Sequence, residues 1–534
     1  MKILYNANIH TLDGKQPLVS AAALDGERIL AVGSDDVVLG EFKGKGEAIN
    51  LEGFTIIPGL MDAHIHLEQY ALGLSKIDAG TETRQECLER VAMEARAAAP
   101  GEWLLGHGWN QNIWPEGYGY ADDLDKAAPE NPVFMTAKSL HAAWVNSSAL
   151  RLAGISPDTE DPPGGRISRD TKGTPDGLLF EGAISLVENV IPLTSGDDTV
   201  AALCAALPVL WEMGLTGAHD FDRSSCFQAL QVLNQRKLLK FRVLKSVPVE
   251  DLPHAVTLGL RSGFGDDYLR IGQVKIFADG ALGPRTAAML QPYKNEPDNR
   301  GMLLVDSEEL FEYGRLAMEN GFGLAVHAIG DRANHEVLKG FGMLRDYKAP
   351  QEHVGININA EYIRHRIEHV QVLHPDDVKS LADLGIIASM QPIHATSDMH
   401  MVDSCLGERA EFAYAWQSQF ESGAVLAFGS DAPVETPDPF VGLHAAVSRR
   451  RADGSPSPQG WHPEQRLPFG EALKAYTSGA AYAANQEDRL GKLIPGYLAD
   501  LIVLDTDPFL CEPEQLLEIK VLRTMVGGEW VFMR

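Results

Sequence analysis

Two histidines, His64 and His66, form the feature of the sequence best suited to chemistry. They stand in Asp62-Ala63-His64-Ile65-His66, at the end of an apolar run that starts after Pro58-Gly59. If this run is a β-strand, residues i and i+2 point to the same face, so the two imidazoles project side by side. Two imidazoles at that spacing can hold one metal ion, although two hydrogen-bonded core histidines would give the same pattern.

Four more residues with metal-binding or basic side chains stand at or near the ends of later apolar runs: Lys275, His327, His369 and Asp431. Each has an ordinary alternative, because a strand lysine can extend its amine to solvent, a histidine can be structural and an aspartate can cap a helix. The six residues together, in this order along the chain, favour one shared metal site over six independent packing roles.

Strand-length apolar runs alternate with helix-length segments through the middle of the chain. The eight runs are Gly59–His66, Gly217–Phe221, Phe241–Val247, Gly272–Ala278, Gly323–His327, Arg366–Val370, Ile386–Gln391 and Val425–Gly429. This alternation is typical of a parallel (β/α)8 barrel, whose active site lies at the carboxyl ends of the strands. In that order Lys275 belongs to strand 4, His327 to strand 5, His369 to strand 6 and Asp431 to strand 8. A doubly wound open sheet would use the same alternation.

The two ends of the chain contain short strand-like runs separated by glycine turns. Neither end has enough of them for a stable sheet, so we expect residues 1–57 and 488–534 to form one small β-domain together. The barrel would then occupy residues 58–487. The interval from about residue 70 to 210 breaks the strand–helix rhythm and is predicted to be an insertion after the first barrel strand.

The sequence resembles the amidohydrolase superfamily of metal-dependent hydrolases, and within it the amidohydrolase 3 or YtcJ-like branch, which includes N-substituted formamide deformylases. The resemblance covers nearly the whole chain and rests on Ile57–His66, Gly106–Gln111 followed by Trp114-Pro115, Val274–Gly283, Gly429–Pro433 and Gly491–Leu501. It implies a distorted (β/α)8 TIM barrel with a composite β-sandwich from both termini. It also implies these metal ligands: His64, His66, Lys275, His327, His369 and Asp431.

The same resemblance implies that Lys275 is carboxylated and bridges two metal ions. Burial lowers the pKa of a lysine, which favours the neutral amine that reacts with carbon dioxide. The ligand types suit two zinc ions, and also manganese, iron or cobalt. A divalent metal lowers the pKa of bound water to about 7 and polarises a carbonyl oxygen. Asp431 is the candidate catalytic residue, because it could take a proton from that water and deliver it to a leaving amine.

We therefore expect a hydrolase that cleaves a carbon–nitrogen bond other than a peptide bond by attack of metal-bound hydroxide. The substrate would be a small-molecule amide, N-substituted formamide or cyclic amide. A mononuclear deaminase of the same superfamily is the first alternative, but Lys275 and the presence of Asp331 shortly after His327 favour the amide hydrolase. A barrel that binds a ligand without turnover is the second alternative.

Six residues are candidate substrate contacts: Trp109, Trp114, His141, Glu181, Arg285 and His394. The two tryptophans could wall an apolar pocket, although tryptophan is also an ordinary core residue. His394 lies just past the seventh strand, near the expected barrel mouth. Arg285 could hold a carboxylate or carbonyl of the substrate, or could pair with a surface acid.

The composition limits the class of partner. Lysine and arginine number 46 against 74 aspartates and glutamates, so the net charge of −28 disfavours binding to nucleic acid or to an anionic membrane. Five scattered cysteines without a CxxC pair, and the lack of a signal-like or membrane-spanning apolar segment, predict a cytoplasmic protein without disulfides. A homodimer is expected only as the commonest oligomer.

Overall fold

The computed structural model describes residues 1–111, 114–138, 142–163, 165–192, 195–347 and 363–534. These residues divide into two compact units. The larger comprises Met1–Tyr70 and Leu203–Arg534, and the smaller comprises Ala71–Ala202. The larger unit contains a barrel and the strands from both chain ends, whereas the smaller unit has a sheet of its own.

Eight parallel strands form the barrel of the larger unit. In chain order they are β8 (Leu60–Ile65), β15 (Leu215–Asp220), β16 (Arg242–Pro248), β17 (Leu269–Phe277), β18 (Leu324–Ala328), β19 (Arg366–His369), β20 (Ile387–Met390) and β21 (Leu426–Phe428). Strands that are consecutive in this order are hydrogen-bonded neighbours. Asp431 N donates to His64 O at 2.7 Å, and His66 N donates to Ala432 O at 2.9 Å, so the segment after β21 returns to β8. The predicted barrel is confirmed, and its strands are the eight predicted runs.

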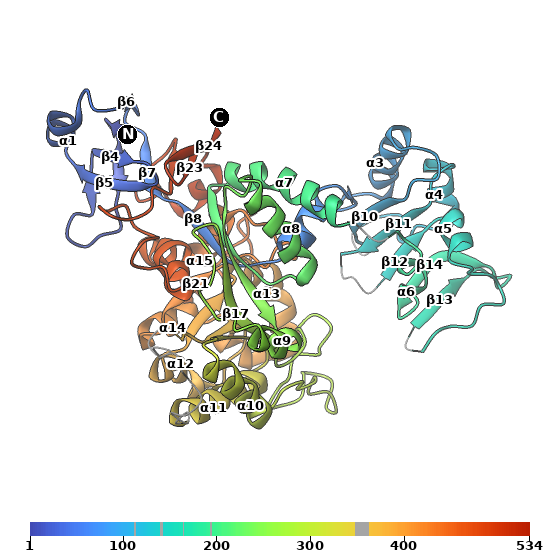
Figure 1. The fold of residues 1–534 in the computed structure, drawn as a ribbon. Coiled ribbons are helices and arrows are strands. Elements are labelled where there is room, and N and C mark those ends of the chain that lie inside the picture. The colour runs from blue at the N-terminus through green and yellow to red at the C-terminus, as the bar shows by residue number, and fades with distance from the viewer. Residues whose placement is uncertain (112–113, 139–141, 164, 193–194, 348–362) are drawn as a thin grey trace. The chain divides into compact units, whose positions relative to one another are not determined.

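Helices lie outside these strands (Figure 1). They are α2 (Leu67–Gly73), α7 (Gly196–Glu212), α8 (Ser224–Gln235), α9 (Leu252–Thr257), α10 (Ser307–Glu319), α11 (Asp331–Asp346), α12 (Ser380–Leu384), α13 (Pro392–Leu406), α14 (Trp416–Ser422), α15 (Pro439–Ser448), α16 (Phe469–Lys474) and α17 (Ala480–Ala483). α10 starts at a capping box, in which the Asp306 carboxylate accepts from the N–H groups of Glu308 and Glu309. α11 buries Val337, Phe341 and Leu344, whose spacing places them on one helical face.

Strands from the two chain ends form a pair of sheets in the larger unit. One sheet contains β1 (Lys2–Tyr5), β4 (Ala21–Asp25), β5 (Arg28–Gly33) and β6 (Glu47–Asn50), which α1 (Asp35–Phe42) covers. The other contains β2 (Asn8–His10), β3 (Leu18–Val19), β7 (Thr55–Pro58), β22 (Leu501–Leu504), β23 (Val521–Val526) and β24 (Glu529–Met533).

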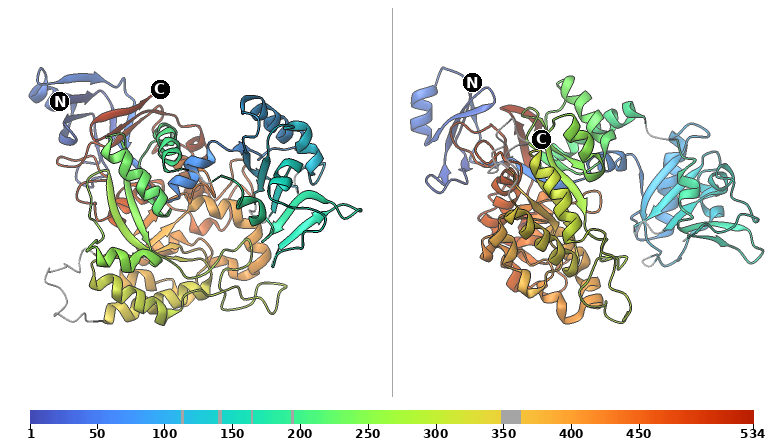
Figure 2. Two further views of the ribbon diagram at one scale, coloured as in Figure 1. Left: turned by 45° about the vertical axis from the view of Figure 1, so that its right-hand side comes forward. Right: turned by 60° about the horizontal axis from the view of Figure 1, so that its bottom comes forward.

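An antiparallel pairing of β7 with β22 joins the N-terminal and C-terminal strands in one sheet. Figure 2 shows these strands side by side from two directions. Buried side chains of both sheets, among them Leu4, Leu24, Ile56 and Val503, belong to one apolar core. The two sheets therefore form a composite β-sandwich.

The smaller unit is built on a six-stranded mixed sheet. Its strands are β9 (Ile77–Asp78), β10 (Leu104–Trp109), β11 (Val133–Ala137), β12 (Ala142–Val145), β13 (Gly165–Arg169) and β14 (Pro175–Glu181), and its helices are α3 (Arg84–Ala97), α4 (Ala121–Ala127), α5 (Ser147–Leu152) and α6 (Ser185–Glu188). Leu104, Val133 and Leu178 belong to one buried core, whereas the next residues Phe134 and Leu179 belong to another. Because successive strand residues face opposite sides, both faces of this sheet are covered.

Within the parts of the chain that the structure describes, none of the helices has both the length and the apolar character needed to span a membrane.

Candidate metal centre

The histidine pair predicted from the sequence lies at the carboxyl end of β8, beside Asp431. His64 Nε2 and His66 Nε2 lie 3.5 Å and 3.4 Å from Asp431 Oδ1. The centroids of the two imidazole rings are 5.8 Å apart. The His64 side chain is buried, whereas those of His66 and Asp431 are 20% and 14% exposed. Solvent therefore reaches this group of side chains from the side of His66 and Asp431.

Asp62 ties the end of β8 to the loop that carries Asp431. Its carboxylate accepts from His64 N at 2.9 Å, from Ser430 N at 3.0 Å and from the Ser430 hydroxyl at 2.5 Å. Burial raises the pKa of Asp62 to about 7, although these hydrogen bonds oppose the rise. A Cβ atom on Gly429 would lie 2.4 Å from His64 N, so only glycine lets the loop approach β8 this closely.

His369, His394 and Asp431 form a second group of possible metal ligands. His394 lies in the first turn of α13, and its Nε2 is 3.3 Å from Asp431 Oδ2. The first group consists of His64, His66 and Asp431, and the second of His369, His394 and Asp431. Within each group, the ligand atoms lie within 4.8 Å of one another. Asp431 thus directs Oδ1 to His64 and His66 and Oδ2 to His394. His394 was predicted as a substrate contact, and its place among the possible ligands was missed.

The backbone is left-handed at two residues of these groups. The φ angle is 76° at His369 and 61° at Asp431. In a regular strand, Glu368 and His369 would face opposite sides, yet Glu368 Oε2 lies 2.6 Å from His64 Nδ1 and the His369 ring lies 4.9 Å from the His64 ring. The left-handed turn at His369 allows both to face His64. Such strained positions are concentrated at functional sites.

One nitrogen of each strand-end histidine is held by an oxygen of the protein. The contacts are His64 Nδ1 to Glu368 Oε2 at 2.6 Å, His66 Nδ1 to Asp222 Oδ1 at 3.2 Å, His369 Nδ1 to Gln391 Oε1 at 2.8 Å and His327 Nε2 to Gly280 O at 3.0 Å. These oxygens accept, so the ring nitrogen in each contact donates. The other nitrogen of each ring is then the one that could bind a metal.

The charge state of the four strand-end imidazoles suits metal binding for all but His66. Burial lowers the pKa of His64 to about 4 and that of His327 to about 3, and it lowers the pKa of His369 well below its ordinary value. His66 differs: burial lowers its pKa, but hydrogen bonds with Asp222 and Asp431 outweigh burial and raise it to about 9. A metal ion at His66 Nε2 would take the place of that proton.

Lys275 lies on β17 and is buried, with 5% of its surface exposed. Its Nζ is 4.5 Å from the ring centroid of Phe221 and 4.8 Å from that of Phe277. Burial lowers its pKa to about 8, although the charges of Glu368 and Asp431 oppose the change. A fraction of this amine is therefore neutral at mildly alkaline pH.

A third group of possible metal ligands lies at the end of β15 and is already in contact with a lysine. Asp220, Asp222 and Cys226 place ligand atoms within 4.8 Å of one another. Lys245 Nζ lies 3.0 Å from Asp220 Oδ2 and donates to the carbonyl oxygen of Asp222. The ammonium group stands where a cation would bind, so this group is part of the structure around His66.

The two tryptophans predicted to wall a pocket lie in the core of the smaller unit. Trp109 and Trp114 are 1% and 3% exposed, and their N–H groups donate to Met135 O and Thr81 O. Both tryptophans are therefore core residues, which was the alternative to a pocket wall.

The remaining predicted substrate contacts are found in different parts of the chain. Arg285 forms an ion pair with Glu296, which was its alternative role. Glu181 ends β14 in the smaller unit. His141 lies outside the described residues. Asp331 is the residue shortly after His327 whose presence disfavours the deaminase alternative. It is the first residue of α11, and its carboxylate accepts from Leu290 N at 2.7 Å.

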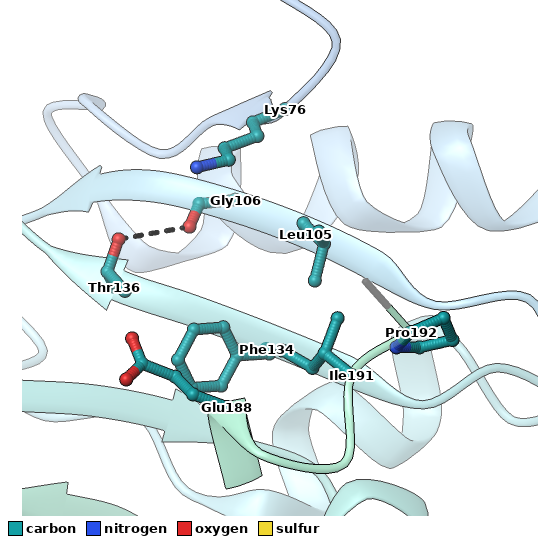
Figure 3. A pocket seen from close by; sticks show the side chains of 8 residues that line it. All are labelled: Lys76, Leu105, Gly106, Phe134, Thr136, Glu188, Ile191 and Pro192. Atoms are coloured by element: carbon teal, nitrogen blue, oxygen red, sulfur yellow. Dashed lines mark hydrogen bonds between the residues drawn. The ribbon is translucent and has the colours of Figure 1, made fainter. Parts of the chain in front are cut away.

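A hollow of about 280 Å³ lies on the sheet of the smaller unit (Figure 3). It is lined by Lys76, Leu105, Gly106, Phe134, Thr136, Glu188, Ile191 and Pro192. Figure 3 shows Lys76, Thr136 and Glu188 toward one end and the aliphatic side chains toward the other. This lining contains neither histidine nor cysteine, and the groups of possible metal ligands found among the described residues belong to the barrel.

The family model of the amidohydrolases, Amidohydro_3, matches residues 47–532. The chain belongs to the amidohydrolase family. This amidohydrolase is 36% identical over 496 residues to the protein YtcJ of Bacillus subtilis (strain 168), a match that covers 91% of this chain and 90% of that protein. It is 28% identical over 543 residues to N-substituted formamide deformylase of Arthrobacter pascens, covering 98% of this chain and 97% of that enzyme.

Among solved structures, this amidohydrolase is similar to an uncharacterized metal-dependent hydrolase from Pyrococcus horikoshii OT3. The TM-score is 0.78 with 27% sequence identity, and the match covers 96% of this chain and 99% of that one. Together with the barrel and the convergent histidines, the family places the chain among the metal-dependent hydrolases of the amidohydrolase superfamily.

Proposed function

We propose that this amidohydrolase cleaves a carbon–nitrogen bond other than a peptide bond, in an amide, an N-substituted formamide or a cyclic amide. The observation that carries the proposal is the position of Asp431 between two groups of histidines, with Oδ1 toward His64 and His66 and Oδ2 toward His394. The similarity to N-substituted formamide deformylase supports the formamide class in particular.

The residues present fit divalent metal ions. Imidazole nitrogens and a carboxylate oxygen are ligands that zinc takes, and the opposite ring nitrogens of His64, His66 and His369 are tied back to protein oxygens. We propose that two zinc ions bind here, held by His64, His66, Lys275, His327, His369 and Asp431. A bound divalent ion would polarise the substrate carbonyl and lower the pKa of water.

Lys275 would bridge the two ions as a carbamate. The neutral Nζ forms a bond to the carbon of carbon dioxide, and the amine releases a proton. The lowered pKa of about 8 supports this step, because it leaves part of the amine unprotonated near neutral pH. The anionic product would also replace a poorly solvated cation inside the barrel by a metal ligand.

Asp431 would move the proton during hydrolysis. Burial raises its pKa, but hydrogen bonds with His394 and His66 outweigh burial and lower the pKa well below its ordinary value. The carboxylate is therefore ionised at neutral pH and can accept a proton from the attacking water. It then delivers the proton to the nitrogen of the leaving amine, so that the C–N bond breaks to give a neutral amine.

The test is turnover of N-substituted formamides, simple amides and cyclic amides by zinc-loaded enzyme, with an aminopurine as the deaminase substrate. We expect amine release from at least one amide class and loss of that activity in Asp431→Asn. Deamination of the aminopurine without amide hydrolysis would contradict the proposal and favour the mononuclear deaminase.

A further inference from the structure

Glu368 is a fully buried carboxylate that faces three donor groups. Its Oε2 lies 2.6 Å from His64 Nδ1 and 3.0 Å from Arg366 Nη2, and its Oε1 lies 2.5 Å from Arg366 Nε. Glu368 and Arg366 alternate along β19, and neither is exposed to solvent. Since β8 and β19 are not neighbours in the sheet, the carboxylate reaches His64 across the barrel interior.

Arg366 is itself fixed by further contacts. Its Nη2 donates to Ala63 O at 2.6 Å and to Ser389 Oγ at 2.5 Å, and its Nη1 lies 2.7 Å from His219 Nδ1. The guanidinium therefore has one position, which sets the position of the Glu368 carboxylate. Buried ion pairs rarely add much stability, so the placement of His64 is the clearer consequence of this pair.

His66 has an equivalent arrangement with Asp222, which follows the neighbouring strand β15. Asp222 Oδ1 accepts from His66 Nδ1 at 3.2 Å and from Gln69 Nε2 at 3.1 Å, and Oδ2 accepts from Glu68 N at 2.6 Å. Lys245 donates to the backbone carbonyl of Asp222, which holds the residue in place. Both oxygens of Asp222, like those of Glu368, face donors.

We propose that Glu368 and Asp222 are positioning residues that keep a proton on Nδ1 of His64 and His66 and so direct both Nε2 atoms to the metal centre. Arg366 and Lys245 hold the two carboxylates. The inference rests on the proposed function, because it takes His64 and His66 as metal ligands.

Amide substitutions test this role with almost no change in size. In Glu368→Gln, the amide group must point its NH2 either at Arg366 Nε or at His64 Nδ1 and Arg366 Nη2, so a donor faces a donor in both orientations. Asp222→Asn meets the same conflict, with His66 Nδ1 and Gln69 Nε2 on one side and backbone N–H groups on the other. An ionised carboxylate carries no donor and therefore avoids this conflict: Glu368 Oε2 accepts from His64 and Arg366 Nη2, and Oε1 meets Arg366 Nε as an ion pair.

The experiment measures zinc affinity of the metal-free full-length protein by competition with a chelator. We expect Glu368→Gln and Asp222→Asn each to bind zinc 10–100-fold more weakly than wild type. Asp500→Asn is the matched control. Asp500 forms a buried pair with Arg242, with Arg242 Nη2 2.8 Å from Asp500 Oδ1, and among the described residues its carboxylate accepts from Arg242 and Gly527 N and from no histidine. This variant should keep wild-type zinc affinity.

A spectroscopic measurement separates positioning from general destabilisation. In metal-free protein labelled with ¹⁵N-histidine, His64 should carry its proton on Nδ1 in wild type and should partly shift it to Nε2 in Glu368→Gln. If one variant fails to fold, the other still tests the proposal.

The outcomes also separate this inference from the proposed function. Wild-type zinc affinity in both folded variants and an unchanged His64 tautomer in Glu368→Gln, with zinc binding weakened in His64→Asn, would overturn the positioning role alone. Zinc affinity that is unaffected by His64→Asn would contradict the proposed metal site, and the positioning role with it.

Discussion

Lys275 is a lysine whose burial should make the stability of the metal-free protein depend on pH. Its amine lies inside the barrel beside the rings of Phe221 and Phe277. Methionine has a similar length and no charge, so Lys275→Met removes the amine while filling nearly the same space. The variant should therefore be more stable than wild type wherever the lysine is protonated in the folded protein.

The pKa fixes the size and direction of this effect. Burial lowers the pKa of Lys275 from 10.5 to about 8, which corresponds to about 3 kcal/mol of free energy of unfolding. The folded protein binds fewer protons than the unfolded chain between these values, so stability rises with pH there. Below pH 8 both states are protonated and the whole cost of burying the charge is present. Above pH 10.5 both are neutral and the cost is gone.

The assay is denaturant unfolding of metal-free protein in bicarbonate-free buffer at pH 7, 9 and 10.5. We expect Lys275→Met to exceed wild type by about 3 kcal/mol at pH 7 and the difference to shrink toward zero at pH 10.5. Lys245→Met is the control, because it removes the ion-pair partner that lies 3.0 Å from the buried Asp220 carboxylate and should lower stability instead. A difference between Lys275→Met and wild type that does not change with pH would refute the reasoning.

Three further substitutions probe different parts of the chain. Asp431→Asn should lower kcat by about 10²-fold or more with zinc retained, as measured by amine release and elemental analysis; unchanged kcat would contradict its role in proton transfer. Asp500→Asn should lower the free energy of unfolding by about 3–5 kcal/mol, because it leaves the buried Arg242 unpaired; a change below about 1 kcal/mol in denaturant unfolding would show that the pair is unimportant. Trp109→Ala should cost about 3–5 kcal/mol through loss of core packing without changing zinc content; an altered zinc content would connect this residue to the metal site.

The barrel could be predicted from the sequence because each strand is a short apolar run, and five of the eight runs carry one or two of the predicted metal ligands at or near their end. Such runs reflect burial on both faces of a parallel sheet, and the alternation with helices sets their order. The histidine pair, His327, His369 and Asp431 could be placed at strand ends for the same reason. Because the carboxyl ends of all eight parallel strands lie at one end of a barrel, these residues were expected to lie close together there.

The contacts between distant elements could not be predicted in this way. Glu368 reaches His64 across the barrel, and His394 approaches Asp431 from the first turn of a helix, so neither follows from the periodicity of one strand. The charged pair Arg366 and Glu368 within an apolar run was a sequence signal for a buried ion pair. Trp109 stands in a loop-like glycine-rich segment, but its burial depends on a whole sheet that local sequence does not specify.

The metal content of the purified chain tests the central claim most directly. After incubation with zinc and bicarbonate and removal of free ions, elemental analysis should find about two ions per chain in wild type and fewer in Lys275→Ala and in His64→Asn. Wild-type protein that retains no metal, or that retains one ion regardless of either substitution, would contradict a two-metal centre built on these residues.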